Sequence, residues 1–210
     1  MIVVVDGTGP DSDVEYSKEM DNSFCSQIAN RAGGTYFRGP SFTGVEVSSL
    51  ADKAAAAAIQ LSNFGKPIAL AGYSRGGCAV INAAIRLKGR GVRVSALFLF
   101  DAVDMQVSEL GSTQVIPDNV DFVAHARSAR SAKFWVANPV KSRWYFINTG
   151  RWLAGSGTMH EKSFVGTHGA LGGVPWPDVR GDAGSALAVA GWMNSELNSH
   201  GLPVGLKVIV

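Results

Sequence analysis

Residues 67–87 read PIALAGYSRGGCAVINAAIRL, an apolar run, a serine between glycines and a second apolar run in immediate succession. The first run, Pro67–Gly72, predicts a short buried strand, and the periodic second run, Cys78–Leu87, predicts a helix. The serine between them fits the pattern G-x-S-x-G, which places a serine on a strained strand-to-helix turn where side chains at the glycine positions would clash. Because the chain has 25 glycines, a chance match is a serious alternative. The strand before the motif and the helix after it favour Ser74 as a catalytic nucleophile.

The alternation of strands and helices continues around this stretch. Apolar runs at residues 2–5 and 92–100 predict two further buried strands, and residues 17–32 and 47–64 predict helices that end at glycines. Strands that alternate with helices of this length imply βαβ units. The predicted fold class is therefore α/β, a three-layer sandwich with a mostly parallel central sheet.

The second half of the chain has weaker patterns. Residues 119–126 and 143–147 are expected to be strands, and residues 182–199 a last helix with Asp182 as its N-cap. Residues 155–182 are rich in glycine and proline and predict a long functional loop.

A serine hydroxyl is a poor nucleophile, so Ser74 needs a base to take its proton. His168 follows an apolar stub and stands among small residues in a loop, which makes it the preferred base, with His160 as the alternative. His125 lies in an apolar strand-like segment and is expected to be a core histidine. His200 stands beside a glycine at the end of the last predicted helix, where a histidine commonly caps the C-terminus.

The base must in turn be oriented by an acid. Asp101 directly follows the strand predicted over residues 92–100, at the edge where parallel α/β sheets assemble their sites. Asp104 is the alternative three residues later, and a carboxylate that merely caps the turn is the structural alternative. The predicted triad is Ser74, Asp101 and His168.

The loop after the first strand has two interpretations. In a serine hydrolase it supplies the second oxyanion donor, for which the backbone N–H groups of Gly7 and Thr8 are candidates beside that of Arg75. Asp6-Gly7-Thr8 also fits a phosphatase whose nucleophilic aspartate lies two residues earlier. That position is Val4, which cannot attack phosphorus, so the phosphatase interpretation is set aside.

Composition indicates an ordinary globular protein. The chain has 210 residues, 46% hydrophobic and 17% charged, and a formal net charge of +2, which does not indicate nucleic-acid binding. One domain over residues 1–210 is expected, with room for a cap or loop insertion around residues 105–165. Cys25 and Cys78 match no zinc or redox spacing and are expected to be free thiols. No metal or organic cofactor is expected, because triad chemistry needs none.

The N-terminus goes straight into an apolar run without a basic segment or a small-residue cleavage site. No apolar stretch approaches the roughly 18 residues that would span a bilayer. The expected location is the cytoplasm, or outside the cell by a route that needs no cleavable signal.

Four motifs in chain order resemble one family, the α/β hydrolases that include phospholipase effectors of bacterial type VI secretion. They are Val5-Asp6-Gly7-Thr8, Gly72-Tyr73-Ser74-Arg75-Gly76-Gly77, Phe100-Asp101-Ala102-Val103 and Gly166-Thr167-His168-Gly169-Ala170-Leu171-Gly172-Gly173. The resemblance implies an α/β-hydrolase fold and a triad of Ser74, Asp101 and His168. The family usually has an aspartate where Ala170 stands and a glycine where Asp104 stands. Phospholipid as the substrate does not carry over with the fold.

Residues 122–160 contain no acidic residue, and their basic side chains are interleaved with aromatic ones. This pattern suits an anionic membrane surface or a phosphate-bearing substrate, and nucleic acid less well. Alternation along strands, with aromatics in the core and basic groups in solvent, produces the same pattern.

The sequence thus predicts a serine hydrolase that cleaves carboxylic esters, an esterase or lipase with a small-molecule or lipid substrate, phospholipid among the candidates. A cutinase-like enzyme or an acyltransferase on the same fold is one alternative. A catalytically silent binding module is another.

Overall fold

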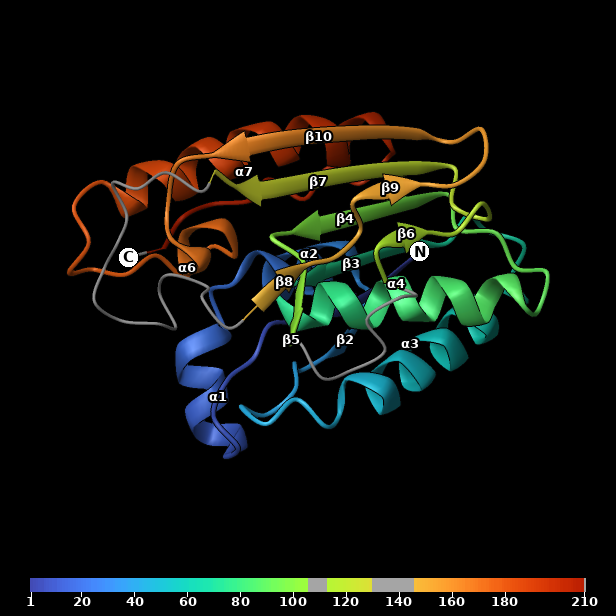
Figure 1. Cartoon of the computed structure of the whole chain (residues 1–210), viewed down its shortest axis with the longest axis horizontal. Coiled ribbons are helices and arrows are strands. Elements are labelled where there is room, and N and C mark those ends of the chain that lie inside the picture. Colours follow the sequence, from blue (N-terminus) through green and yellow to red (C-terminus); the bar gives the residue numbers. More distant parts are fainter. Residues whose placement is uncertain (106–112, 130–145, 210) are drawn as a thin grey trace.

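The structure is a computed structural model that describes residues 1–105, 113–129 and 146–209. Its centre is a six-stranded sheet in which every pair of neighbouring strands is parallel (Figure 1). In spatial order the strands are β10 (Thr158–Phe164), β7 (Phe122–Ser128), β4 (Ala96–Phe100), β3 (Ala69–Tyr73), β1 (Ile2–Val5) and β2 (Thr35–Phe37). The predicted mostly parallel central sheet is confirmed.

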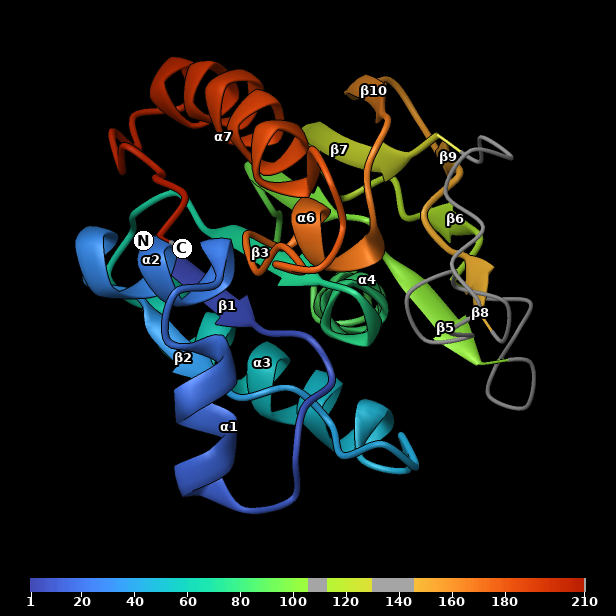
Figure 2. The ribbon, with the colours of Figure 1, turned by 90° about the vertical axis from the view of Figure 1, so that its left-hand side faces the viewer.

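Helices cover both faces of this sheet (Figure 2). Within the described ranges the helices are, in chain order, α1 (Asp13–Met20), α2 (Phe24–Ala32), α3 (Val47–Ser62), α4 (Arg75–Lys88), α6 (His168–Leu171) and α7 (Asp182–Ser199). Successive side chains of a strand point to opposite faces. Val3 and Leu70 therefore pack in one buried cluster with α3 and α4, and Val4 and Ala71 pack in a second cluster with α2 and α7. The three-layer sandwich is confirmed.

The helix predicted over residues 17–32 is wrong, because the structure has two helices there. α1 ends at Met20 and α2 begins at Phe24. Ser23, between them, has non-helical backbone angles (φ −58°, ψ 154°), and its Oγ accepts a hydrogen bond from the backbone N–H of Ser26 at 2.9 Å. A serine that caps the second helix interrupts the apolar periodicity that the two helices share.

The long loop predicted over residues 155–182 is wrong in part. Residues 158–164 form the edge strand β10, and residues 168–171 form the helical turn α6. β10 has one neighbour in the sheet, and most of its side chains are exposed, so its sequence lacks the apolar pattern of a buried strand. β2, the strand at the opposite edge, has only three residues, which are too few to show a strand pattern in the sequence.

The last helix has the predicted bounds, but its predicted cap is wrong. Gly181 occupies the N-cap position of α7 with a φ of +86°, and Asp182 is the first residue inside the helix. The Asp182 side chain is fully buried and bonds to other segments of the chain.

Two small sheets lie beside the main one. β5 (Val103–Met105) is antiparallel to β8 (Phe146–Asn148), and β6 (Val115–Ile116) is parallel to β9 (Trp152–Leu153). The strand predicted over residues 143–147 overlaps β8 at residues 146 and 147. Residues 143–145 lie outside the described ranges.

The single domain with an insertion around residues 105–165 stays a prediction, because much of that range is not described. Cys25 and Cys78 are buried and form no disulfide. Within the described ranges, no helix combines the length and apolarity that crossing a membrane requires.

Candidate active site

Ser74 stands on the turn between β3 and α4. Its φ of +56° and ψ of −129° are rare for a residue with a side chain. A Cβ added at Gly72 would lie 2.6 Å from the carbonyl oxygen of Gly76, and one added at Gly76 would lie 2.1 Å from the carbonyl oxygen of Asp6. The backbone N–H of Ser74 donates to the carbonyl of Phe100 at 3.0 Å, which ties the turn to β4. The glycines of the motif are thus required by close backbone approach.

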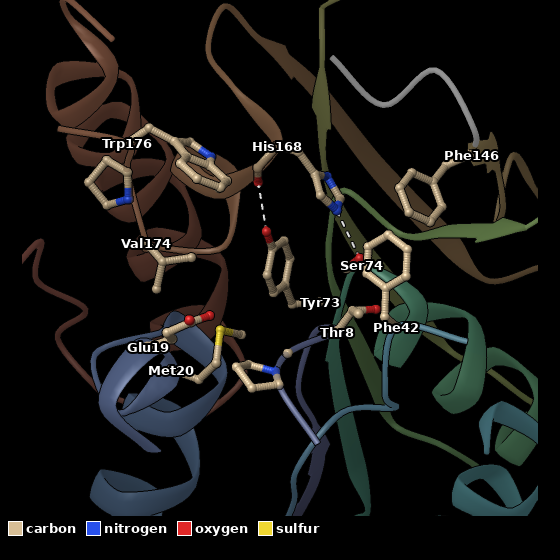
Figure 3. A pocket seen from close by; sticks show the side chains of 14 residues that line it. Thr8, Glu19, Met20, Phe42, Tyr73, Ser74, Phe146, His168, Val174 and Trp176 are labelled. Atoms are coloured by element: carbon tan, nitrogen blue, oxygen red, sulfur yellow. Dashed lines mark hydrogen bonds between the residues drawn. The ribbon is translucent and has the colours of Figure 1, made fainter. Parts of the chain in front are cut away.

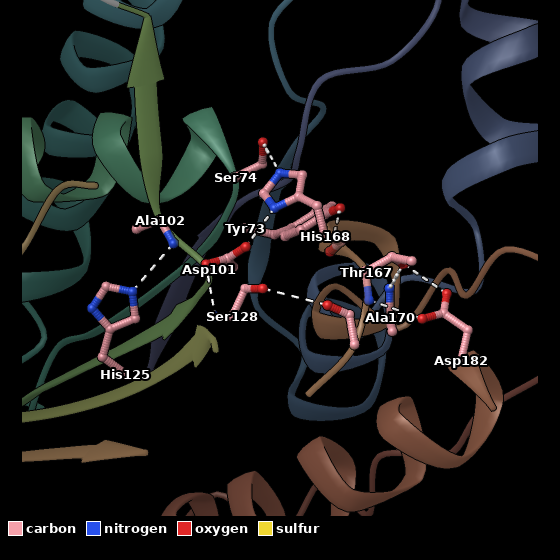
Figure 4. A network of polar contacts seen from close by, with 11 residues as sticks. Tyr73, Ser74, Asp101, Ala102, His125, Ser128, Thr167, His168, Ala170 and Asp182 are labelled. Atoms are coloured by element: carbon pink, nitrogen blue, oxygen red, sulfur yellow. Dashed lines mark hydrogen bonds and ion pairs between the residues drawn. The ribbon is translucent and has the colours of Figure 1, made fainter. Parts of the chain in front are cut away.

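The structure brings Ser74, His168 and Asp101 together, as Figure 4 shows. Nε2 of His168 lies 2.8 Å from Oγ of Ser74, and Nδ1 of His168 lies 2.7 Å from Oδ2 of Asp101. All three residues are buried, at 3%, 8% and 1% exposure respectively. An imidazole held between a hydroxyl and a carboxylate can accept the hydroxyl proton and be stabilised as it does so.

Asp101 follows the last residue of β4 and has a φ of +44°. Its backbone N–H donates to the carbonyl of Ala126 at 2.7 Å, and its Oδ1 accepts from the backbone N–H of Ser128 at 3.1 Å. These two bonds to β7 leave Oδ2 facing His168. The alternative acid, Asp104, is buried in β5, and it is Asp101 that accepts from the imidazole.

Tyr73 holds His168 in place through a hydrogen bond and a ring contact, a role that sequence reasoning missed. Its hydroxyl donates to the backbone carbonyl of His168 at 3.0 Å, and the two rings lie 5.1 Å apart. Thr167 caps α6, since its Oγ accepts from the backbone N–H of Ala170 at 3.2 Å. His168 is therefore fixed at the first position of a capped helical turn rather than in an open loop.

The other three histidines lie elsewhere. His125 is fully buried in β7, where its Nε2 accepts from the backbone N–H of Ala102 at 3.2 Å, as expected of a core histidine. His160 on β10 pairs with Glu196. His200 caps the end of α7, and its Nδ1 lies 2.9 Å from the Glu196 carbonyl.

The three candidate oxyanion donors, the backbone N–H groups of Gly7, Thr8 and Arg75, are not equally available. The backbone N–H of Gly7 donates to Oδ1 of Asp6 at 2.7 Å, so it already has an acceptor. Thr8 lines the pocket beside Ser74, and among the described residues no partner is found for its backbone N–H. Thr8 and Arg75, the first residue of α4, are therefore the better candidates for the two oxyanion donors.

The side chain of Arg75 is buried at 1% exposure and joins two loops. Its Nε donates to Oγ1 of Thr8 at 2.7 Å, and its Nη2 donates to the carbonyls of Ser41 and Phe42 at 2.8 and 2.9 Å. Burial lowers the pKa of the guanidinium. The sequence motif contains this arginine but gives no sign of its side-chain role.

Asp6 lies below the same loop in a buried polar network. Its Oδ2 accepts from the hydroxyls of Ser23 and Tyr36 at 2.5 and 2.8 Å. The hydroxyl of Tyr16 donates to the carbonyl of Gly7 at 2.7 Å, which fixes the loop from the other side. Burial raises the pKa of Asp6 to about 6, although its hydrogen bonds oppose the shift.

We expect Asp6 to make the protein less stable as pH rises from about 4 to about 6. A carboxyl whose pKa is raised from 3.8 to about 6 in the folded state binds its proton more tightly there than when unfolded. Its contribution to the free energy of unfolding is fully present below the unfolded pKa and is lost as pH passes the folded pKa, ~3 kcal/mol in all. Urea unfolding of wild type and Asp6→Asn at several pH values measures the difference.

The stability of wild type relative to Asp6→Asn should fall over this interval, because other titrating groups cancel in the comparison. Asp21→Asn, at an exposed aspartate, is the matched control and should show no such trend. A difference between wild type and Asp6→Asn that does not change with pH would refute the expectation.

A pocket of about 560 Å³ opens at Ser74 and His168 (Figure 3). Its apolar walls include Phe42 and Phe146 on one side and Met20, Val174 and Trp176 on the other. Glu19, exposed at the end of α1, is the one carboxylate among the described lining residues. A mostly apolar pocket beside an activated hydroxyl suits the hydrocarbon part of an acyl group.

Two further predictions concern binding. Much of the basic and aromatic stretch predicted to favour an anionic surface lies outside the described residues, and that proposal gains nothing from the structure. Within residues 1–105, 113–129 and 146–209, no group of three or more histidine, cysteine or acidic side chains is placed to hold a metal ion.

A family model described as "Thioesterase domain" matches residues 16–130, more than half of the chain. No curated protein matched the sequence. Among solved structures, the RedJ thioesterase from the prodiginine biosynthetic pathway of Streptomyces coelicolor is 14% identical, with 93% of this chain and 86% of that chain covered and a TM-score of 0.45. An esterase from the archaeon Pyrobaculum calidifontis is 14% identical, with 96% and 78% covered and a TM-score of 0.49.

A hydrolase of the α/β superfamily from Xanthomonas campestris, described as putative, is 18% identical, with 92% and 98% covered and a TM-score of 0.40. The family match and the observed sheet give the chain an α/β-hydrolase fold. The comparisons do not single out the secreted phospholipases that the sequence resembles.

Proposed function

The chain belongs to the thioesterase-domain family, and we propose that it hydrolyses the thioester of an apolar acyl group through an acyl-enzyme on Ser74. The observation that carries the proposal is the position of His168 between the Ser74 hydroxyl and the Asp101 carboxylate. The family match supports a thioester over the carboxylic ester that the sequence alone suggested. The carboxylic ester stays as the second candidate, since the same triad can attack either carbonyl.

In the proposed reaction, Oγ of Ser74 attacks the carbonyl carbon while Nε2 of His168 takes its proton. Asp101 holds the proton on Nδ1 of His168 and stabilises the imidazolium that forms. The backbone N–H groups of Thr8 and Arg75 donate to the oxyanion. The carbon–sulfur bond then breaks and His168 returns the proton to the leaving thiolate. Water attacks the acyl-enzyme by the same steps and releases the carboxylic acid.

The pocket supports an acyl substrate of moderate size. Its walls are hydrocarbon and aromatic surface, and burying such surface favours binding by about 25 cal/mol per Å². A small acyl compound is therefore the proposed ligand. Anionic membrane binding and a phospholipid substrate stay as earlier predictions without further support.

The remaining alternatives differ in what accepts the acyl group. A cutinase-like enzyme would hydrolyse a polymer ester, with water as the acyl acceptor. An acyltransferase would transfer the acyl group to another alcohol. An intact hydrogen-bonded triad speaks against a catalytically silent binding module, because such a module needs no imidazole between Ser74 and Asp101.

The test is a matched pair of substrates, an alkyl thioester and the alkyl oxoester of the same acyl group, in a series of acyl lengths. We expect a higher kcat/KM for the thioester, and a covalent intermediate whose added mass equals the acyl group in rapidly quenched samples. Faster turnover of the oxoester would move the assignment to an esterase. Acyl transfer to an added alcohol in preference to water would indicate an acyltransferase. No turnover and no adduct with any member would leave only the binding module.

A further inference from the structure

We propose that Asp182 is a positioning residue that ties the Trp176 wall of the acyl pocket to the segment that carries His168. This inference rests on the proposed function. It adds a structural link between the acyl group in the pocket and the rate of attack by Ser74. An acyl group that reaches Trp176 then affects the position of the base and not only the strength of binding.

The Asp182 carboxylate is fully buried and accepts three hydrogen bonds from two separate segments. Oδ1 accepts from the backbone N–H of Thr167 at 2.9 Å. Oδ2 accepts from the hydroxyl of Thr167 at 2.6 Å and from the backbone N–H of Trp176 at 2.8 Å. One carboxylate therefore fixes Thr167, the residue just before His168 (Figure 4), and also Trp176, which forms part of the pocket wall.

Packing joins the same two segments a second time. A Cβ added at Gly169, next to His168, would lie 2.6 Å from Nε1 of Trp176 and 2.5 Å from the carbonyl oxygen of Val174. The backbone N–H of Val174 also donates to the carbonyl of Gly169 at 3.0 Å. The indole thus packs against the backbone of α6. A displacement of the indole would therefore also displace the helical turn that begins at His168.

Helix capping does not explain this carboxylate. Gly181 occupies the N-cap of α7, and all three donors to Asp182 belong to segments outside that helix. Asparagine at this position would keep the shape but replace one oxygen by an amide that donates. Because backbone N–H groups approach both oxygens, the amide must face one of them, and either Thr167 or Trp176 loses its anchor.

The experiment measures covalent labelling by two fluorophosphonates, one with an ethyl chain and one with a decyl chain. In wild type the decyl probe should react faster, because its chain contacts the Trp176 wall. In Asp182→Asn both rates should fall, by up to about 10²-fold, since small misplacements of a catalytic group have effects of this size. The ratio of the two rates should approach one. Asp178→Asn, an exposed aspartate in the same segment, is the matched control and should keep wild-type rates and ratio.

Thr167→Val separates the two anchors and serves if Asp182→Asn fails to fold. It removes the Thr167 hydroxyl, and with it both the bond to Asp182 and the cap on the backbone N–H of Ala170, but it keeps both backbone bonds to Asp182. The rates of both probes should therefore fall together while their ratio is retained. Thr167→Ser should restore the rates. Folded Asp182→Asn with wild-type rates and ratio, or Thr167→Val with wild-type rates, would overturn the proposal. Wild type that reacts with neither probe would instead count against the proposed function.

Discussion

Replacing Ser74 with alanine should lower kcat by about 10⁶-fold and abolish fluorophosphonate labelling, because loss of a triad serine leaves only the oxyanion donors and substrate binding to act. Alanine retains the Cβ, so the strained backbone at φ +56° meets no new side-chain atom. The effect is therefore expected in the rate and not in folding. Steady-state kinetics on the preferred thioester and gel-based labelling are the two measurements.

Ser195→Ala is the control for this experiment, since Ser195 is an exposed serine on α7. It should keep wild-type rates and labelling. Labelling that persists in Ser74→Ala would place the nucleophile on another residue. Loss of labelling together with loss of the thermal unfolding transition would show that the turn itself had failed, and the assignment of Ser74 would then lack its kinetic basis.

Replacing Asp101 with asparagine should lower kcat by about 10⁴-fold. Oδ1 of Asp101 accepts from the backbone N–H of Ser128, so asparagine must keep its carbonyl oxygen there and turn its amide toward His168. Nδ1 of His168 then has to accept a hydrogen bond, which moves the ring proton to Nε2. An imidazole in that tautomer cannot take the proton of Ser74. Asparagine tolerates a positive φ, so the backbone at 101 is not strained further.

Kinetics of Asp104→Asn provide the comparison, because the chemical change is the same and Asp104 is also buried. Its effect on kcat should be much smaller than that of Asp101→Asn. The reverse order would assign the triad acid to Asp104. Circular dichroism spectra of both variants establish whether each rate refers to folded protein.

The sequence predicts the centre of this fold well because the central strands are buried on both faces. β1, β3 and β4 are continuous apolar runs, and the elbow between β3 and α4 has glycines where backbone segments come within van der Waals contact. Such features are local in sequence. The edge strand β10 was missed because exposure leaves its sequence polar, and β2 was missed because three residues are too few to show a pattern. The α1–α2 break depends on a single capping serine.

In the candidate site, too, the residues with local sequence signals could be predicted and those held by long-range contacts could not. His168 could be selected because its small neighbours are visible in the sequence, although it lies in a helical turn and not in the predicted loop. Asp101 could be selected because it directly follows a predicted strand. Tyr73 and Asp182 could not, since their hydrogen bonds join residues 95 and 15 positions apart. The preference for Thr8 over Gly7 likewise depends on where the Asp6 carboxylate points, which no spacing rule reveals.

The buried guanidinium of Arg75 has a consequence for changing what the enzyme accepts. It donates to the hydroxyl of Thr8, beside the proposed oxyanion position, and to the backbone carbonyls of Ser41 and Phe42. Phe42 forms part of one pocket wall. Redesign of the Phe42 loop is therefore constrained, because a graft that shifts those carbonyls also moves Thr8, the proposed oxyanion donor. The opposite wall at Met20 belongs to α1, a separate helix, and is the better starting point for directed evolution of acyl selectivity.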